Sequence, residues 1–271
     1  MPKTTVQNWN GIPVEVVRSR RGVTAFLDYR DNLIRDNNCA WPPPELIQKL
    51  CRSDRVSAFL REDQALLENR LGYYTDLQSI HSEDAIQWSF FGPIVYAEAD
   101  LRVAFSNWLA VKLGLAKRNQ QCTIALWRRI PHPDTLGSGG PELDLLIVGD
   151  EFAVVVESKW RSGEGRWQGS TGNQSQLQLR QQFLEKCGAS LLEKRELMVL
   201  YVVLDGSQKP SNDVQSAFPV KSLEWAELCE WESHPNWDEF QRYYEWKCNL
   251  VARGVGVPAP GRRLINPQVT Q

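Results

Sequence analysis

The hydrophobic positions of this chain place a strand-rich segment between helices. Residues 141–160 consist of an apolar run, a Gly-Asp turn and a second apolar run, which is typical of a β-hairpin. Residues 121–129 alternate between apolar and polar and predict a strand. Residues 196–204 are almost wholly apolar, as expected of a strand covered on both faces. Spacing and capping signals predict helices at about 82–91, 98–113, 174–187 and 225–248, the last with a break at His234-Pro235.

This order of elements predicts an α/β fold in which a mixed central β-sheet is flanked by helices. We expect an N-terminal appendage over residues 1–75, a core over 76–215, and a C-terminal helical extension with a loop-rich tail over 216–271. A Trp-Pro-Pro-Pro segment at 41–44 interrupts the appendage. The elements expected within the appendage are a short hairpin at 14–17 and 23–28 and helices at 45–51 and 56–71.

Charged side chains fall at positions of the predicted hairpin where aliphatic residues would normally be buried. Because side chains alternate along a strand, these residues all project to one face if the turn has two residues. Buried charge is costly unless a metal ion or an ionic partner compensates it, so this cluster is the leading candidate for a functional site. The four residues are Glu142, Asp144, Glu157 and Lys159.

The pairing of the two strands decides whether the carboxylates can act together. A two-residue turn at Gly149-Asp150 places Asp144 opposite Val155 and makes Asp144 and Glu157 diagonal neighbours, roughly 7–8 Å apart between backbones. At that separation both carboxylates can reach a single cation. A three-residue turn would shift the register by one and send them to opposite faces, so the candidate site depends on the even register.

Composition and charge limit the classes of function. With 42% hydrophobic and 24% charged residues, the chain of 271 residues has an ordinary globular composition. We see neither an apolar run of 18 residues nor a basic-then-apolar leader, so we expect a cytoplasmic protein with no membrane partner. The six cysteines and three histidines form no zinc-binding spacing, and free thiols are the expected state.

A net charge of −2 excludes a globally basic protein, so a nucleic acid would have to be held by local basic patches. One candidate patch lies in residues 111–130, which contain five basic residues and no acid. Scattered basic residues of this kind are equally typical of an ordinary solvated surface. The five are Lys112, Lys117, Arg118, Arg128 and Arg129.

The order of elements, with Asp144 on the middle strand and Glu157-Ser158-Lys159 ending the next, resembles the PD-(D/E)XK, or restriction-endonuclease-like, nuclease superfamily. The resemblance covers roughly residues 80–205. A helix that starts with Ser-Glu-Asp-Ala at 82–85, before the sheet, is also similar to members of this group. The resemblance implies a restriction-endonuclease-like core and an enzyme, a Mg²⁺-dependent nuclease.

The resemblance also implies roles for the clustered residues. Asp144 and Glu157 would ligate Mg²⁺, with Mn²⁺ as a substitute, together with the backbone carbonyl of Ser158. Oxygen ligands of this kind suit such hard cations. Lys159 would orient or activate the attacking water and stabilise charge on the phosphate, since its ammonium is a compact point charge and donor.

For two further acidic residues, the sequence allows either a role in the site or an ordinary structural role. Glu142 is expected to bind a second metal ion or an outer-sphere water, or else to be a solvated acid at a strand edge. Glu83 is expected to complete the acidic cluster, or else to complement the dipole at a helix start. The residues expected to contact the substrate are Arg161, Arg166, Gln174 and Gln178, although the two glutamines are also typical of an ordinary helix surface.

Two kinds of function fit this pattern. The first is metal-dependent phosphodiester hydrolysis by an endonuclease acting on double-stranded DNA, and the resemblance extends it to prokaryotic restriction or phage (antiviral) defence. Homodimerisation is a reasonable expectation for cutting two strands. The second is a catalytically inactive nuclease-fold module that binds nucleic acid or a partner protein, which the eleven tryptophans slightly favour. An enzyme directed at RNA ranks last, because no RNA-recognition signature is present.

Overall fold

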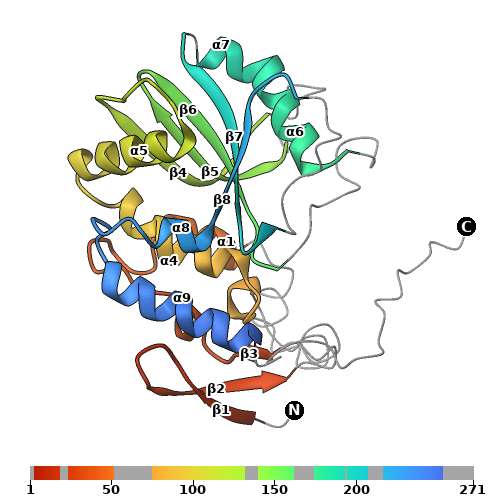
Figure 1. Cartoon of the computed structure of the whole chain (residues 1–271). Helices are drawn as coiled ribbons and strands as arrows, with labels where there is room; N and C mark the ends of the chain where they lie inside the picture. The colour runs from red at the N-terminus through yellow and green to blue at the C-terminus, as the bar shows by residue number, and fades with distance from the viewer. Residues whose placement is uncertain are drawn as a thin grey trace, which may run out of the picture. The chain divides into compact units, whose positions relative to one another are not determined.

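The computed structural model of the protein describes residues 3–18, 24–51, 75–131, 140–161, 174–192, 194–206 and 216–252 (Figure 1). The chain forms two compact units. The first draws on Met1–Ile34, Leu46–Ala85 and Arg242–Gln271, and the second on Arg35–Glu45 and Ile86–Gln241. The three-part division along the chain that the sequence predicts stays a prediction.

The second unit is built on a five-stranded mixed sheet with the strand order β4-β5-β6-β7-β8. Strand β5 is antiparallel to both of its neighbours, whereas β7 is parallel to β6 and β8 is parallel to β7. All of β6 is buried, and so is nearly all of β7, which explains their continuous apolar sequences. The strands are β4 (Cys122–Arg129), β5 (Glu142–Gly149), β6 (Phe152–Ser158), β7 (Glu196–Val203) and β8 (Val220–Glu224).

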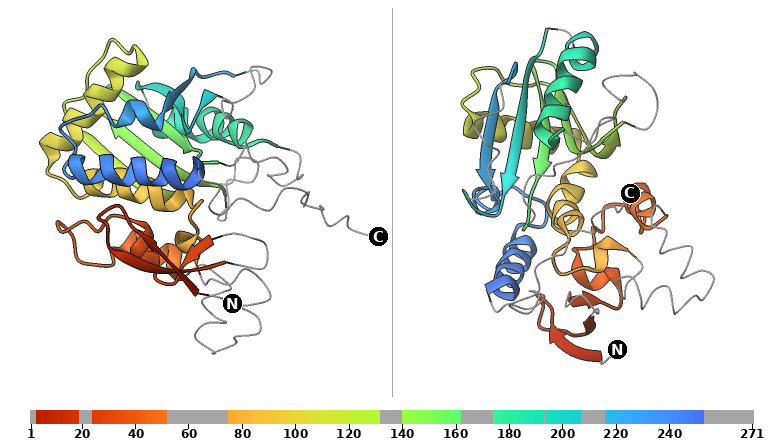
Figure 2. Two further views of the ribbon diagram at one scale, coloured as in Figure 1. Left: turned by 60° about the horizontal axis from the view of Figure 1, so that its bottom comes forward. Right: turned by 90° about the vertical axis from the view of Figure 1, so that its right-hand side faces the viewer.

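Helices cover both faces of this sheet. Helix α6 contributes Leu177 and Phe183 to a core shared with β6 and β7, and Figure 2 shows α5 on the opposite side of the sheet. A π-helical turn (Leu184–Gly188) joins α6 to α7. The helices that lie wholly or mostly in this unit are α4 (Glu83–Val95), α5 (Ala99–Leu113), α6 (Gln176–Phe183), α7 (Ala189–Leu191) and α8 (Trp225–Leu228), whereas α9 (Trp237–Ala252) begins in this unit and belongs to the first from Arg242 onward. The mixed sheet flanked by helices that the sequence predicts is therefore confirmed.

The turn of the central hairpin lies one residue later than the sequence predicts. Leu146, not Asp144, pairs with Val155, because the residues that connect β5 to β6 are Asp150 and Glu151. Gly149 is the last residue of β5 and lies against the Asn119 side chain. Only glycine fits there, because a Cβ would lie 1.9 Å from that side chain. The register thus moves by two residues, which preserves the faces predicted for the paired part of the hairpin.

Helix α4 does not end near residue 91, as the sequence predicts, but continues through Gly92 and Pro93 to Val95, so the predicted end is wrong. Gly92 instead serves packing, because a Cβ at this position would lie 2.8 Å from the ring of Trp88. The helix beyond Ser82 begins as expected, with the Ser82 hydroxyl accepting a hydrogen bond from the Ala85 N–H at 3.0 Å. The break expected at His234-Pro235 is present and separates α8 from α9.

The first unit contains a three-stranded antiparallel sheet in the order β1-β2-β3. The hairpin expected at 14–17 and 23–28 corresponds to β2 and β3, while β1 was not predicted. Buried residues of this unit include Val16, Phe26, Ile80 and Leu250. Its elements are β1 (Lys3–Gln7), β2 (Pro13–Arg18), β3 (Thr24–Phe26), the short 3₁₀ helices Tyr29–Asn32 and Asp76–Gln78, and most of α1 (Pro44–Cys51). The helix expected at 56–71 lies outside the described residues.

Among the helices that the structure describes, none has the length and apolarity needed to cross a membrane.

Candidate functional site

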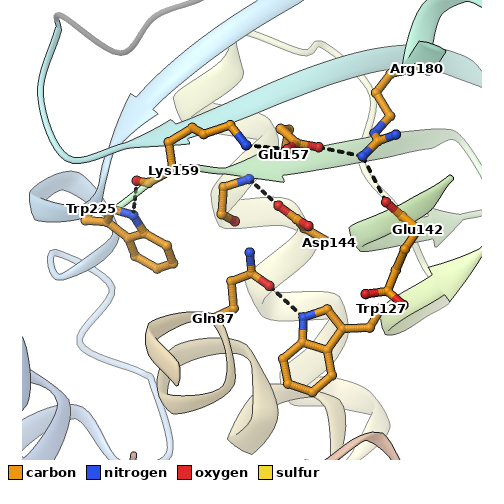
Figure 3. A network of polar contacts seen from close by, with 9 residues as sticks. Gln87, Trp127, Glu142, Asp144, Glu157, Lys159, Arg180 and Trp225 are labelled. Carbon is orange, nitrogen blue, oxygen red and sulfur yellow. Dashed lines mark hydrogen bonds and ion pairs between the residues drawn. The ribbon is translucent and has the colours of Figure 1, made fainter. Parts of the chain in front are cut away.

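The charged residues of the hairpin gather where β5 begins and β6 ends (Figure 3). Glu142 is the first residue of β5, and Glu157 precedes the last residue of β6. Lys159 follows that strand directly, and its backbone is fixed on two sides. Its N–H donates to the Val202 carbonyl at 2.7 Å, and its own carbonyl accepts from Trp225 Nε1 at 3.0 Å. The antiparallel pairing of the two segments that carry these residues was predicted correctly from the sequence.

Glu157 is the centre of a buried ionic network. Lys159 Nζ lies 2.5 Å from Glu157 Oε1, and Arg180 Nη2 lies 2.7 Å from Glu157 Oε2. The same Arg180 nitrogen donates to the backbone carbonyl of Glu142 at 2.8 Å. All three ionic side chains are at most 3% exposed. Burial of this kind is tolerated only because each charge has a partner.

Asp144 is held at the point where the pairing of β5 with β6 ends. The last paired residues are Leu145 and Val156, and beyond them Asp144 Oδ2 accepts a hydrogen bond from the Ser158 N–H at 2.8 Å. Burial, and to a lesser extent the negative charge of Glu157, raise the pKa of Asp144 to about 8 against the opposing effect of Lys159. The two carboxylates are therefore close enough to repel each other.

Two residues that the sequence did not single out lie next to this cluster. Trp127 has φ = 51°, a left-handed conformation that is a genuine outlier for a bulky residue. The residues on either side of it pair with those on either side of Asp144, so Trp127 lies beside Asp144 across β4 and β5. Its Nε1 donates to Gln87 Oε1 at 2.6 Å, and both side chains are buried below Asp144 in Figure 3. Strained backbone of this kind is frequent at functional sites.

Arg180 was also missed, although a signal for it exists. Leu177, Phe183 and Leu184 lie three or four residues from Arg180 and are all buried, so Arg180 stands on the apolar face of its helix. A charged residue at such a position has to find a buried partner. The side chain has two nitrogens, Nε and Nη1, that are buried and have no hydrogen-bond partner among the described residues.

The four residues predicted to contact the substrate differ in their surroundings. Arg161 is exposed and lies two residues after Lys159, while Arg166 lies outside the described residues. Gln178 is part of a capping box at the start of α6, where its Oε1 accepts from the Ser175 N–H at 2.8 Å. Gln174 has a buried Oε1 without a hydrogen-bond partner in the described part of the chain.

Glu83 is the first residue of α4 and is half-buried. It belongs to the first unit, whereas the hairpin cluster belongs to the second. Its expected part in the acidic cluster therefore stays a prediction. As an acid in the first turn of a helix, it also matches the alternative assignment, complementing the helix dipole.

Comparison with known proteins gives no relative. No protein-family model, curated protein or solved structure matches this chain. The case for a function therefore rests on the residues of the site and on their chemistry.

The oxygen atoms at the site are ligands of the type that hard divalent metal ions such as Mg²⁺ prefer. Within the described residues no group of three or more His, Cys, Asp and Glu side chains is arranged to hold one. Asp144 and Glu157 would supply two carboxylates. Hard cations such as Mg²⁺ commonly use one or two carboxylates and fill their remaining positions with other oxygens, here including the Ser158 carbonyl. The raised pKa of Asp144 shows that negative charge at this position is incompletely compensated, and a cation would correct this.

Proposed function

We propose that the protein is a metal-dependent nuclease that hydrolyses phosphodiester bonds in DNA as an endonuclease. One observation carries the proposal: two mutually repelling carboxylates, Asp144 and Glu157, meet at the ends of adjacent strands with a buried lysine two residues after the second. Structural ion pairs seldom bring two acids together in this way, because like charges held close together repel each other.

The arrangement of elements supports the same proposal. Helices α4 and α5 precede the meander of β4, β5 and β6, and α6 then leads to β7, which runs parallel to β6. This is the order of elements by which the chain resembles the PD-(D/E)XK nucleases. Asp144 is on the middle strand of the meander and Glu157 on the last, as that resemblance requires.

Each residue then has a distinct function. Asp144 and Glu157, with the Ser158 carbonyl, would hold a Mg²⁺ ion, which would supply concentrated positive charge at the scissile phosphate. Two hydrogen bonds fix the backbone of Lys159 and keep its ammonium at the site, where it can donate to an attacking water or to a phosphate oxygen. Arg161, exposed next to the site, is available for the DNA backbone.

The test is a plasmid-nicking assay with purified protein and Mg²⁺ or Mn²⁺. We expect the wild type to convert supercoiled DNA to nicked or linear forms, and Asp144→Asn and Lys159→Ala to lower the rate at least about a hundredfold. Asp238→Asn and Lys221→Ala, which make the same changes at exposed positions, should cut like the wild type. Identical traces for the wild type and both site variants, under every metal condition, would remove the enzyme hypothesis.

A second candidate function is a nuclease-fold module that binds nucleic acid or a partner protein without cleaving. The observation in its favour is that both oxygens of Glu157 already have cationic partners, so the site is stable without a metal ion. This candidate predicts DNA retention that weakens with salt, without turnover and without calorimetric binding of Mg²⁺ or Mn²⁺. A role in prokaryotic restriction or phage defence, and a homodimer that cuts both strands, are extensions of the first candidate only.

A further inference from the structure

Glu157 has one buried cationic partner on each carboxylate oxygen. Lys159 contacts Oε1 and Arg180 contacts Oε2, at 2.5 and 2.7 Å. A carboxylate engaged in this way is neutralised by the protein itself. A metal ion can therefore reach Glu157 only if it replaces one of the two cations or shares an oxygen with it. The question is which of the two can leave.

Arg180 is held too firmly to leave. Its Nη2 donates both to Glu157 Oε2 and to the Glu142 carbonyl, so one nitrogen joins the end of β6 to the start of β5. The residue is 2% exposed and belongs to α6, whose first turn is fixed by a capping box. Moving Arg180 away would break two hydrogen bonds and leave a buried guanidinium without a counter-ion, which is strongly unfavourable.

Lys159 is the partner that can leave. Its backbone stays in place through the bonds to Val202 and Trp225, so only the side chain has to rotate. The ammonium sits on a flexible four-carbon stem and keeps its hydrogen-bonding capacity in any orientation. Lys159 is 3% exposed, so its ammonium also needs a new hydrogen-bond partner once it leaves Glu157 Oε1, but the rotation of the side chain leaves the backbone of the sheet and of α6 in place.

We propose that the two cations have different functions at this carboxylate. Arg180 is a positioning residue that holds Glu157 and ties β5 to β6, whereas Lys159 is an internal competitor that a divalent ion displaces from Oε1. The inference rests on the proposed metal site and adds to it a positioning residue and an exchange. The exchange also links metal binding to the chemistry, because it frees the ammonium that the reaction needs.

Calorimetric titration with Mn²⁺, in the absence of nucleic acid, tests this directly. Lys159→Met and Arg180→Met are a matched pair, because each removes one positive charge from the same carboxylate. We expect Lys159→Met to lower the Kd for Mn²⁺ about tenfold, since the competitor is gone while the anchor stays. We expect Arg180→Met to leave the Kd within about threefold of the wild type or to raise it, because Glu157 loses its fixed position. Equal tightening in both variants would show that charge alone matters and would overturn the proposal, as would no tightening in Lys159→Met.

Two further variants keep the test decisive. Lys221→Met removes an exposed positive charge and should change the Kd less than about twofold. If Arg180→Met does not fold, Arg180→Lys retains the charge but not the two-way contact, and we expect its Kd for Mn²⁺ to rise at least about threefold. A wild-type Kd in Arg180→Lys would contradict the positioning function.

The outcomes also separate this inference from the proposed function. A wild type that binds no Mn²⁺ contradicts both. A wild type that binds Mn²⁺ and nicks plasmid DNA, while Lys159→Met and Arg180→Met change its affinity equally, leaves the nuclease in place and rejects the exchange.

Discussion

Asp144 is the residue at which stability and the proposed function conflict most. Its carboxylate accepts a hydrogen bond from the Ser158 N–H, but burial and Glu157 raise its pKa to about 8 from the ordinary value of 3.8. A group whose pKa is raised in the folded state stabilises the fold at low pH and loses that contribution as the pH rises through the folded pKa. Between pH 4 and pH 8 the metal-free protein should therefore lose stability through this residue.

Asp144→Asn should remove that loss. The amide oxygen can accept the same hydrogen bond and carries no charge, so the variant and the wild type should be similarly stable near pH 4. At pH 8, in EDTA, we expect the variant to be more stable by on the order of 1 kcal/mol, a Tm higher by roughly 2–4 °C. Thermal melts across this pH range measure the difference.

The matched control is Asp150→Asn, in the turn of the same hairpin. Backbone hydrogen bonds from Gln121 and Gln120 lower the pKa of Asp150, so its charge stabilises the fold at neutral pH. This substitution should lower the Tm at pH 8, opposite to Asp144→Asn. A lower Tm for both variants would contradict the conclusion that the negative charge of Asp144 destabilises the metal-free protein at pH 8.

At the scale of single residues, the sequence predicts what lies within a strand and misses what reaches it from elsewhere. The alternation of side chains along the hairpin was enough to identify Asp144, Glu157 and Lys159 as candidate site residues. Arg180 and Trp127 come from α6 and β4, and their contacts depend on tertiary packing that local spacing does not encode. Only the position of Arg180 on an apolar helix face hinted at its buried partner.

At the scale of elements, the hairpin shows how a distant residue sets a register. A Gly-Asp pair favours a two-residue turn at that place. Here the Asn119 side chain occupies the space beside Gly149, and its oxygen accepts from the N–H groups of Glu151 and Phe152 at 2.9 and 3.2 Å. Asn119 lies before β4, outside the hairpin, so the sequence of the hairpin alone could not reveal the shift.

Strand β4 is an edge strand of the sheet and brings basic residues to the site. Arg128 and Arg129 are exposed at its end and pair with Leu143 and Glu142, the two residues that precede Asp144 in β5. The two lysines of the same basic segment have acidic partners: Lys112 pairs with Glu230, and Lys117 pairs with Glu151. The end of β4 is therefore the better candidate for contact with the DNA backbone.

Replacing both arginines with alanine should weaken DNA binding without changing the Mn²⁺ affinity. Two lost phosphate contacts should reduce the slope of log K against log salt by about 2. Lys117→Ala removes an exposed charge at the other end of β5 and should leave the slope unchanged. An unchanged slope in the double variant, measured by filter binding or fluorescence anisotropy, would place the DNA elsewhere.

At the scale of the whole molecule, the sequence predicted the mixed sheet and its flanking helices because their hydrophobic periods are long and regular. Strands β1 and β8 were missed because they are short and lie outside the apolar segments. The grouping of chain segments into two compact units was not foreseen either, because it joins residues that are far apart in the sequence. The chemistry of the site depends on residues of the second unit, where periodicity was most informative.

The most direct measurement is a crystal of the wild-type protein soaked with Mn²⁺ and examined by anomalous scattering. The account predicts one peak at roughly 2.0–2.2 Å from carboxylate oxygens of both Asp144 and Glu157, with the Lys159 ammonium moved away from Glu157 and Arg180 in place. A soaked crystal in which Lys159 still contacts Glu157 and no peak lies between the two acids would contradict it.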